Sequence, residues 1–152
     1  MNRSAPFNWK LWLLWVFATT LGWLVGSSFL PLELVAGLSI GVAQWLVLRP
    51  LFPHSWWWIV LSASGWMLGW GISMALVIPE SAALIAGIVG LSTGGFQWYS
   101  LRRWVPIAHW WILVSTLAWI IGLSGFTDQR LTGMIVGIIT GIVFELLARH
   151  KK

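Results

Sequence analysis

The chain has 152 residues, of which 59% are hydrophobic and only 9% charged, and its mean hydropathy is +0.84. A water-soluble domain of this length has too small an interior to hide so much apolar surface, so the composition predicts an integral membrane protein. The absence of cysteine excludes disulfides, thiolate nucleophiles and Cys-ligated metal centres. The net charge of +5 comes from residues that flank apolar segments and form no basic patch, which argues against a nucleic-acid partner.

Six apolar stretches have the length, about 17–25 residues, that a helix needs to cross the hydrocarbon core of a bilayer. Breaks that contain proline or a polar turn separate these stretches, and both kinds of residue end helices. We therefore expect an all-α bundle of six transmembrane helices in one membrane domain over residues 1–152. The expected helices are Trp9–Phe29, Leu32–Leu48, Trp56–Ile78, Ser81–Leu101, Ala108–Ser124 and Leu131–Ala148.

Basic residues gather at alternate ends of these helices. If successive helices alternate in direction, both termini and the second and fourth loops lie on one side of the membrane, and the opposite side holds only Arg130. Because Lys and Arg tend to stay in the cytoplasm, both termini are predicted to be cytoplasmic. The same residues could also attract anionic lipid. They are Arg3, Lys10, Arg49, Arg102, Arg103, Arg149, Lys151 and Lys152.

The odd-numbered stretches share one tryptophan and glycine pattern. A tryptophan is followed after seven residues by Gly or Ala, then at once by a second tryptophan, and three residues later by glycine. Repeats of this kind indicate one structural unit used several times. The three copies are Trp15, Gly22, Trp23, Gly26; then Trp58, Gly65, Trp66, Gly69; then Trp111, Ala118, Trp119, Gly122.

The even-numbered stretches repeat a second pattern, G-x-x-x-G-x-x-Q-W-x-x-L-R, over residues 37–49 and 90–102. We interpret residues 137–149 as the third copy of this pattern. This segment keeps the two glycines and Arg149, and it has Phe144 at the Gln position and Glu145 at the Trp position. We expect three parallel hairpin repeats near 9–49, 54–102 and 108–149. Small residues four apart let membrane helices approach closely, so helix packing is expected at Gly37, Gly41, Gly90, Gly94, Gly137 and Gly141.

With these tandem elements, nearly the whole chain resembles uncharacterised multi-pass membrane proteins of cyanobacteria and actinobacteria, a resemblance that implies no particular activity. The resemblance implies a bacterial inner membrane, or a thylakoid membrane in a photosynthetic organism. The abundance of tryptophan, 15 residues, is also similar to that of the tryptophan-rich sensory proteins, which bind porphyrins and sterols. That second likeness is one of composition, because those proteins have five helices and Asn-containing aromatic motifs, whereas Asn here is confined to positions 2 and 8.

Three polar residues within apolar stretches are candidates for ligand binding or for a polar core. Gln44 and Gln97 lie about 7.5 Å of helix rise inside their flanking arginines, where an amide either bonds another helix or contacts a ligand. Glu145 is a carboxylate inside an apolar span and hence a candidate functional residue, although Arg149 at i+4 also predicts a local ion pair.

His54 and His109 precede tryptophan clusters at equivalent ends of two expected helices. Imidazole can ligate the metal of a tetrapyrrole, so both are candidate pigment ligands, and an interfacial aromatic belt is the other interpretation. No three-ligand metal motif and no catalytic motif occurs in the sequence, so we expect a protein that is not an enzyme.

Two functional classes remain at the level of sequence. The first is a structural or accessory subunit, or a binder of a hydrophobic ligand, with a tetrapyrrole pigment, a quinone or a lipid as the cofactor classes. Its partners would be the lipid bilayer, other membrane proteins or a second copy of the chain. The alternative is a transporter or channel for a small solute or ion, with a polar path between the hairpins lined by Gln44, Gln97 and Glu145.

Overall fold

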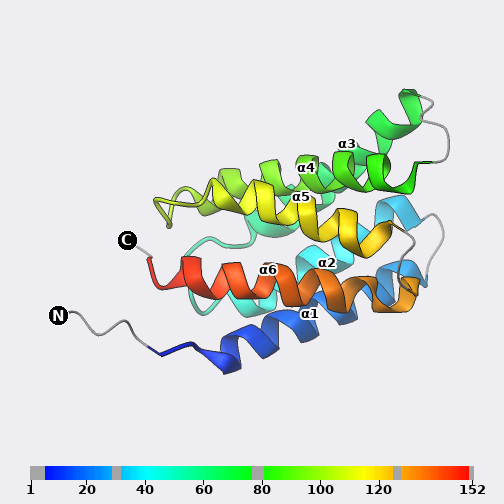
Figure 1. Cartoon of the computed structure of the whole chain (residues 1–152). Coiled ribbons are helices and arrows are strands. Elements are labelled where there is room, and N and C mark those ends of the chain that lie inside the picture. Colours follow the sequence, from blue (N-terminus) through cyan, green and yellow to red (C-terminus); the bar gives the residue numbers. More distant parts are fainter. Residues whose placement is uncertain (1–5, 29–31, 77–80, 125–127, 151–152) are drawn as a thin grey trace.

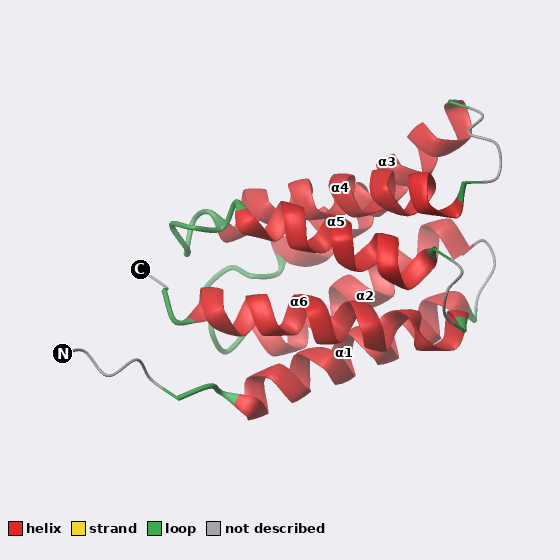
Figure 2. Ribbon diagram, viewed as in Figure 1, coloured by secondary structure: helices red, strands yellow, loops and turns green. Residues whose placement is uncertain are grey.

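The computed structural model describes residues 6–28, 32–76, 81–124 and 128–150, with the side chains of 32–34 left out. Within these ranges the chain forms six α-helices and no strand (Figures 1 and 2). A short 3-10 turn, η1 (Gln129–Leu131), precedes the last helix. The helices are α1 (Trp9–Ser27), α2 (Leu32–Leu48), α3 (Trp57–Ala75), α4 (Ala82–Leu101), α5 (Trp110–Leu123) and α6 (Thr132–Ala148).

Each of the six expected helices corresponds to one of these elements, with ends that differ by a few residues. Polar side chains define two of the starts. The side-chain oxygen of Asn8 accepts a hydrogen bond from the backbone N–H of Leu11 at 3.1 Å, and Ser81 caps Leu84 in the same way. Such caps satisfy N–H groups that have no partner inside the first helical turn.

The helices form a closed ring. Each helix packs against the next along the chain, and α6 packs against α1. Helix α1 begins and helix α6 ends at the same end of the ring, which we call the N/C end, and the loops after α2 and α4 also lie there (Figure 1). Phe52 and Trp104, from these two loops, stack with ring centroids 4.8 Å apart. We call the opposite end, where Gln129 lies, the distal end.

The outer face of the ring is rich in large apolar side chains. Phe17, Leu84 and Leu113, for example, are each at least half exposed. Three helical segments of the described chain are long and apolar enough to cross a membrane: Trp9–Ser27, Trp57–Ala75 and Gln129–Ala148. Val35–Leu48 and Trp110–Leu123 are shorter apolar helices. An apolar exterior around a filled interior is the pattern expected where lipid is the solvent.

Tryptophans from the odd-numbered helices fill the centre of the ring in two layers. The first triad, nearer the N/C end, has ring centroids 5.7–6.0 Å apart, and the second triad has them 4.8–6.2 Å apart. Most of these contacts are edge-to-face, a geometry worth about 0.5–1.5 kcal/mol per pair beyond simple burial. The first triad is Trp15, Trp58 and Trp111, and the second is Trp23, Trp66 and Trp119.

Glycines bring the helix backbones together around these triads. A Cβ atom added at Gly22 would lie 2.6 Å from the Cα of Ile40, and one at Gly65 would lie 2.7 Å from the Cα of Thr93. Of the glycines expected to pack, Gly90 would place a Cβ 2.8 Å from the Cα of a facing residue. Any side chain at these positions would therefore push two helices apart.

The third hairpin has a different register from the one that the sequence suggests. Gly37 and Gly90 lie against Trp66 and Trp119 of the second triad, but the glycine that lies against Trp23 is Gly133. The interpretation that placed Gly137 in this role is therefore displaced by one helical turn. Glycine recurs every fourth residue from 133 to 141, so the sequence motif fits two registers, and the contacts between α6 and α1 select one.

The corrected register changes which residues of α6 break the repeat. Thr140 takes the position of Gln44 and Gln97, and Phe144 takes that of Leu48 and Leu101 in the core around the first triad. Glu145 consequently stands where the first two copies have Arg49 and Arg102, and not where they have tryptophan.

Candidate functional site

A layer of polar side chains separates the two tryptophan triads. The side-chain amide of Gln44 joins three helices: its Nε2 donates to Thr19 Oγ1 at 3.0 Å, and its Oε1 accepts from the indole N–H of Trp58 at 2.9 Å. The amide is 4% exposed, so the interhelical bonds replace contact with solvent or ligand. Each such bond in a membrane interior is worth on the order of 0.6–2 kcal/mol.

Gln97 makes the equivalent bridge in the second hairpin. Its Nε2 donates to Ser62 Oγ at 2.9 Å, and its Oε1 accepts from the indole N–H of Trp111 at 2.8 Å. The structure therefore gives both glutamines the same structural role at the centre of the ring.

Thr140 serves the third hairpin at this level. Its Oγ1 accepts from the indole N–H of Trp15 at 3.0 Å and donates to the Val136 carbonyl at 2.6 Å. Ser115, the residue equivalent to Thr19 and Ser62, is thus left without a glutamine bridge. Thr140 thus makes the bond to tryptophan that Gln44 and Gln97 make, but not their second bond, to a hydroxyl of another helix.

A cavity of about 10 Å³ lies between the triads and is lined in part by Thr93, Ser115 and Thr140. This is about the space of one water molecule. In the part of the chain that the structure describes, the buried Oγ1 of Thr93 has no hydrogen-bond partner. The centre of the ring therefore has room for at most a very small molecule.

Glu145 lies away from the glutamines, at the N/C end between α6 and the start of α1. Its Oε1 accepts from the backbone N–H of Asn8 at 2.8 Å and from Arg149 Nε at 2.9 Å. The carboxylate is 2% exposed, and its Oε2 has no hydrogen-bond partner among the described residues. The hydrogen bond from Asn8 holds the N-terminal segment against the last helix, whereas the ion pair with Arg149 joins two residues one turn apart at the end of α6.

The two candidate pigment ligands, His54 and His109, lie in exposed turns at the N/C end. His54 has a positive φ of 55°, and the ring of His109 contacts Trp110 with centroids 5.6 Å apart. Within the described ranges, no three His, Asp or Glu side chains gather as metal ligands. The structure does not bring either histidine into an apolar cleft.

The arginines at the N/C end rest on aromatic rings. The guanidinium of Arg49 lies 5.8 Å from the ring centroid of Trp45, and that of Arg102 lies 5.1 Å from that of Trp98. Arg102 and Arg103 also approach the ring of Tyr99. Cations held over aromatic rings beside apolar helices are suited to a lipid headgroup region.

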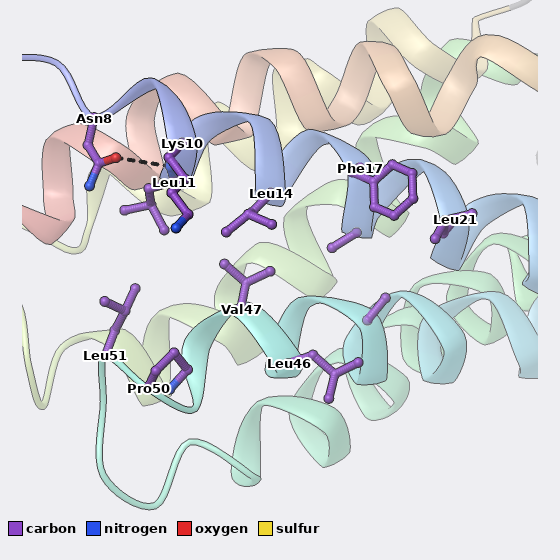
Figure 3. Close-up of a pocket in the computed structure, with 12 residues that line it drawn as sticks. Asn8, Lys10, Leu11, Leu14, Phe17, Leu21, Leu46, Val47, Pro50 and Leu51 are labelled. Carbon is purple, nitrogen blue, oxygen red and sulfur yellow. Dashed lines mark hydrogen bonds between the residues drawn. The ribbon is translucent and has the colours of Figure 1, made fainter.

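A groove of about 400 Å³ runs between α1 and α2 on the outside of the ring. Figure 3 shows Leu14 of α1 facing Val47 of α2 across this groove, which extends from Lys10 at the N/C end to Leu21. Apart from Lys10 and Asn8, its lining residues are apolar. We call it the α1/α2 groove.

A second cleft of about 570 Å³ opens at the distal end and is lined in part by Trp23, Trp66, Trp70 and Arg130. The indole N–H of Trp23 is bonded to the Gln129 carbonyl at 2.7 Å. Those of Trp66 and Trp70 are buried without a hydrogen-bond partner in the described structure. Both the cleft and the α1/α2 groove have volumes typical of sites for small hydrophobic molecules.

The sequence reasoning missed the residues that set these features apart. Thr140 went unnoticed because the alignment of residues 137–149 with the repeat placed Phe144 at the glutamine position. Leu14 went unnoticed although the signal was present: it precedes Trp15, whereas tryptophan precedes Trp58 and Trp111 in the other two copies.

Comparisons with known proteins identify no relative of this chain. The chain matches no protein-family model, no curated protein and no solved structure.

Proposed function

We propose that the chain is a multi-pass protein of a bacterial membrane, with six spanning helices in three parallel hairpins and the N/C end in the cytoplasm. The closed ring with its apolar exterior supports six spans, because α2, α4 and α5 are part of the same ring as the three longer segments. The basic side chains at the N/C end support the orientation. A thylakoid would be the equivalent membrane in a photosynthetic organism.

Within that membrane we propose a non-enzymatic accessory protein that binds a hydrophobic ligand. The observation that carries this proposal is the α1/α2 groove, an apolar cavity of about 400 Å³ that opens on the outer face of the ring and has one cation at its end. A lipid fits this arrangement better than a tetrapyrrole, because neither His54 nor His109 is among the residues that line the groove. A quinone remains an alternative for the cleft at the distal end.

The filled centre of the ring favours ligand binding over transport. A polar path between the hairpins would need an open route past both tryptophan triads, and the cavity between them has about 10 Å³. The side-chain amides of Gln44 and Gln97 are engaged in interhelical hydrogen bonds. Glu145 lies apart from them, at the N/C end of the ring. Flux assays on liposomes with wild type and Glu145→Gln would test the transport alternative directly.

Extraction in a mild detergent tests the proposed function. Native mass spectrometry of the purified protein should find a retained lipid, quinone or partner subunit, and an absorption spectrum should reveal any pigment. A colourless, partner-free monomer that carries no hydrophobic ligand would contradict the proposal.

A further inference from the structure

We propose that the α1/α2 groove binds one acyl chain of a phospholipid in the cytoplasmic leaflet, with the acidic headgroup held by Lys10. This inference rests on the proposed function and specifies its ligand. It depends on three properties of the groove: its length, the charge at its end, and a difference from the second and third hairpins.

The length of the groove matches one leaflet. Within α1, its lining runs from Lys10 to Leu21. Eleven residues of α-helix rise about 16 Å, and half of a hydrocarbon core is about 15 Å thick. A chain that enters beside Lys10 would therefore end near the middle of the bilayer, as the acyl chain of a lipid does.

The charge of the groove suits an anionic headgroup. Lys10 is exposed at the end that corresponds to the membrane surface, and no ion pair engages it among the residues that the structure describes. Glu145, the carboxylate that the structure describes at the N/C end, is already paired with Arg149 and with the backbone of Asn8. An ammonium group in this setting attracts acidic lipid.

The second hairpin contains a smaller version of the same groove. The equivalent cavity between α3 and α4 has about 210 Å³ and is lined by Trp57, Leu61, Tyr99, Ser100 and Arg103. Trp57 and Leu61 occupy the positions of Leu14 and Ala18. The larger side chains account for the smaller volume, and the third hairpin also has tryptophan at this position, Trp110.

The repeat thereby supplies a variant that should close the groove. Leu14→Trp copies the residue that the other hairpins carry, at a side chain that is 46% exposed on the outer face, so the change should not disturb the core. Leu13→Trp is the matched control, because Leu13 is also exposed but does not line the groove. Lys10→Gln removes the charge alone.

The test uses wild type and the three variants in vesicles of equal parts phosphatidylglycerol and phosphatidylethanolamine. After extraction in mild detergent, native mass spectrometry counts the lipids that stay bound. Wild type and Leu13→Trp should retain one lipid and favour phosphatidylglycerol by about fivefold, the effect of one cation near an acidic headgroup. Leu14→Trp should lose that lipid, and Lys10→Gln should keep a lipid without preference between the two.

Equal lipid retention by Leu14→Trp and wild type would overturn the assignment to this groove, and an unchanged preference in Lys10→Gln would overturn the role of Lys10. Either result leaves the proposed function standing, because a hydrophobic ligand would still be bound. A wild-type protein that retains no hydrophobic ligand at all would contradict both.

Discussion

The indole N–H of Trp15 donates to the hydroxyl of Thr140 over 3.0 Å, and this bond joins the first helix to the last. The equivalent tryptophans, Trp58 and Trp111, donate to Gln44 and Gln97. The ring is thus closed by the same kind of contact that joins its consecutive hairpins, but with a shorter partner. A threonine reaches the indole and cannot also reach Ser115, which accounts for the polar cavity at this level.

Thr140→Gln should restore the missing bridge. The longer amide would accept from Trp15 and donate to Ser115, as Gln97 does to Ser62, and would fill the cavity beside it. We expect a gain in unfolding free energy of about 0.5–1.5 kcal/mol, the net value of one buried hydrogen bond. Denaturation in mixed detergent micelles would measure it.

The control for this prediction is the same substitution in a Ser115→Ala background, where the gain should disappear. A Thr140→Gln variant whose stability changes equally with and without Ser115 would contradict the register given to α6.

Gln97→Leu should destabilise the ring. The change keeps the approximate volume but leaves the indole N–H of Trp111 and the hydroxyl of Ser62 buried without partners. The expected loss is about 1–3 kcal/mol, measured by the same denaturation. Thr93→Val is the contrasting variant: its hydroxyl already lacks a partner within the described structure, so stability should stay level or rise. Equal losses in both would refute the bridging role.

Much of the fold could be predicted from the sequence. The six apolar stretches, separated by breaks with proline or polar turn residues, predicted helix ranges close to those of α1 to α6, because helix length and chain breaks are local properties. For the two glutamines the sequence left open an interhelical bond or a ligand contact, because the hydroxyls and indoles that they contact depend on helix rotation. Rotation is decided by the packing of all six helices together.

The register of α6 could not be obtained in the same way. Gly133, Gly137 and Gly141 form a ladder with a four-residue step, and sliding the motif by one step leaves a glycine pair in place. Contacts between helices distinguish the two registers, such as those of Gly133 with Trp23 and of Thr140 with Trp15. In the observed register Glu145 corresponds to Arg49 and Arg102, and its carboxylate bonds the backbone of Asn8 ahead of α1.

Glycines at close contacts should not tolerate alanine. Gly90→Ala would place a methyl group 2.8 Å from the Cα of Thr116 and force α4 and α5 apart, at a cost of about 1–3 kcal/mol. Gly95, on the same helix, has no atom within 4 Å of an added Cβ, so Gly95→Ala should be neutral or stabilising by up to about 1 kcal/mol through helix propensity. Thermal denaturation in detergent compares the two, and similar midpoints would contradict the packing.

Glu145→Ala should release the segment that precedes α1. The carboxylate holds the backbone N–H of Asn8 at 2.8 Å, so its loss should speed hydrogen exchange at that amide while amides in the middle of α1 stay protected. Glu145→Gln keeps an oxygen that can accept from Asn8 and should exchange more slowly than the alanine variant. Exchange measured by mass spectrometry on N-terminal peptides tests this, and no difference between the alanine variant and wild type would argue against the anchor.

The position of the loops predicts the outcome of a labelling experiment on membrane orientation. Because the chain has no cysteine, single substitutions give unambiguous sites for a membrane-impermeant thiol reagent. His54 and His109 are exposed at the N/C end, where Phe52 and Trp104 of the same two loops stack, while Asp128 is exposed at the distal end. His54→Cys and His109→Cys should therefore be protected in intact cells and react after permeabilisation, whereas Asp128→Cys should react in intact cells. Opposite behaviour of the two histidine positions would be incompatible with parallel hairpins in a bilayer, since one ring cannot place stacked loops on different sides of a membrane.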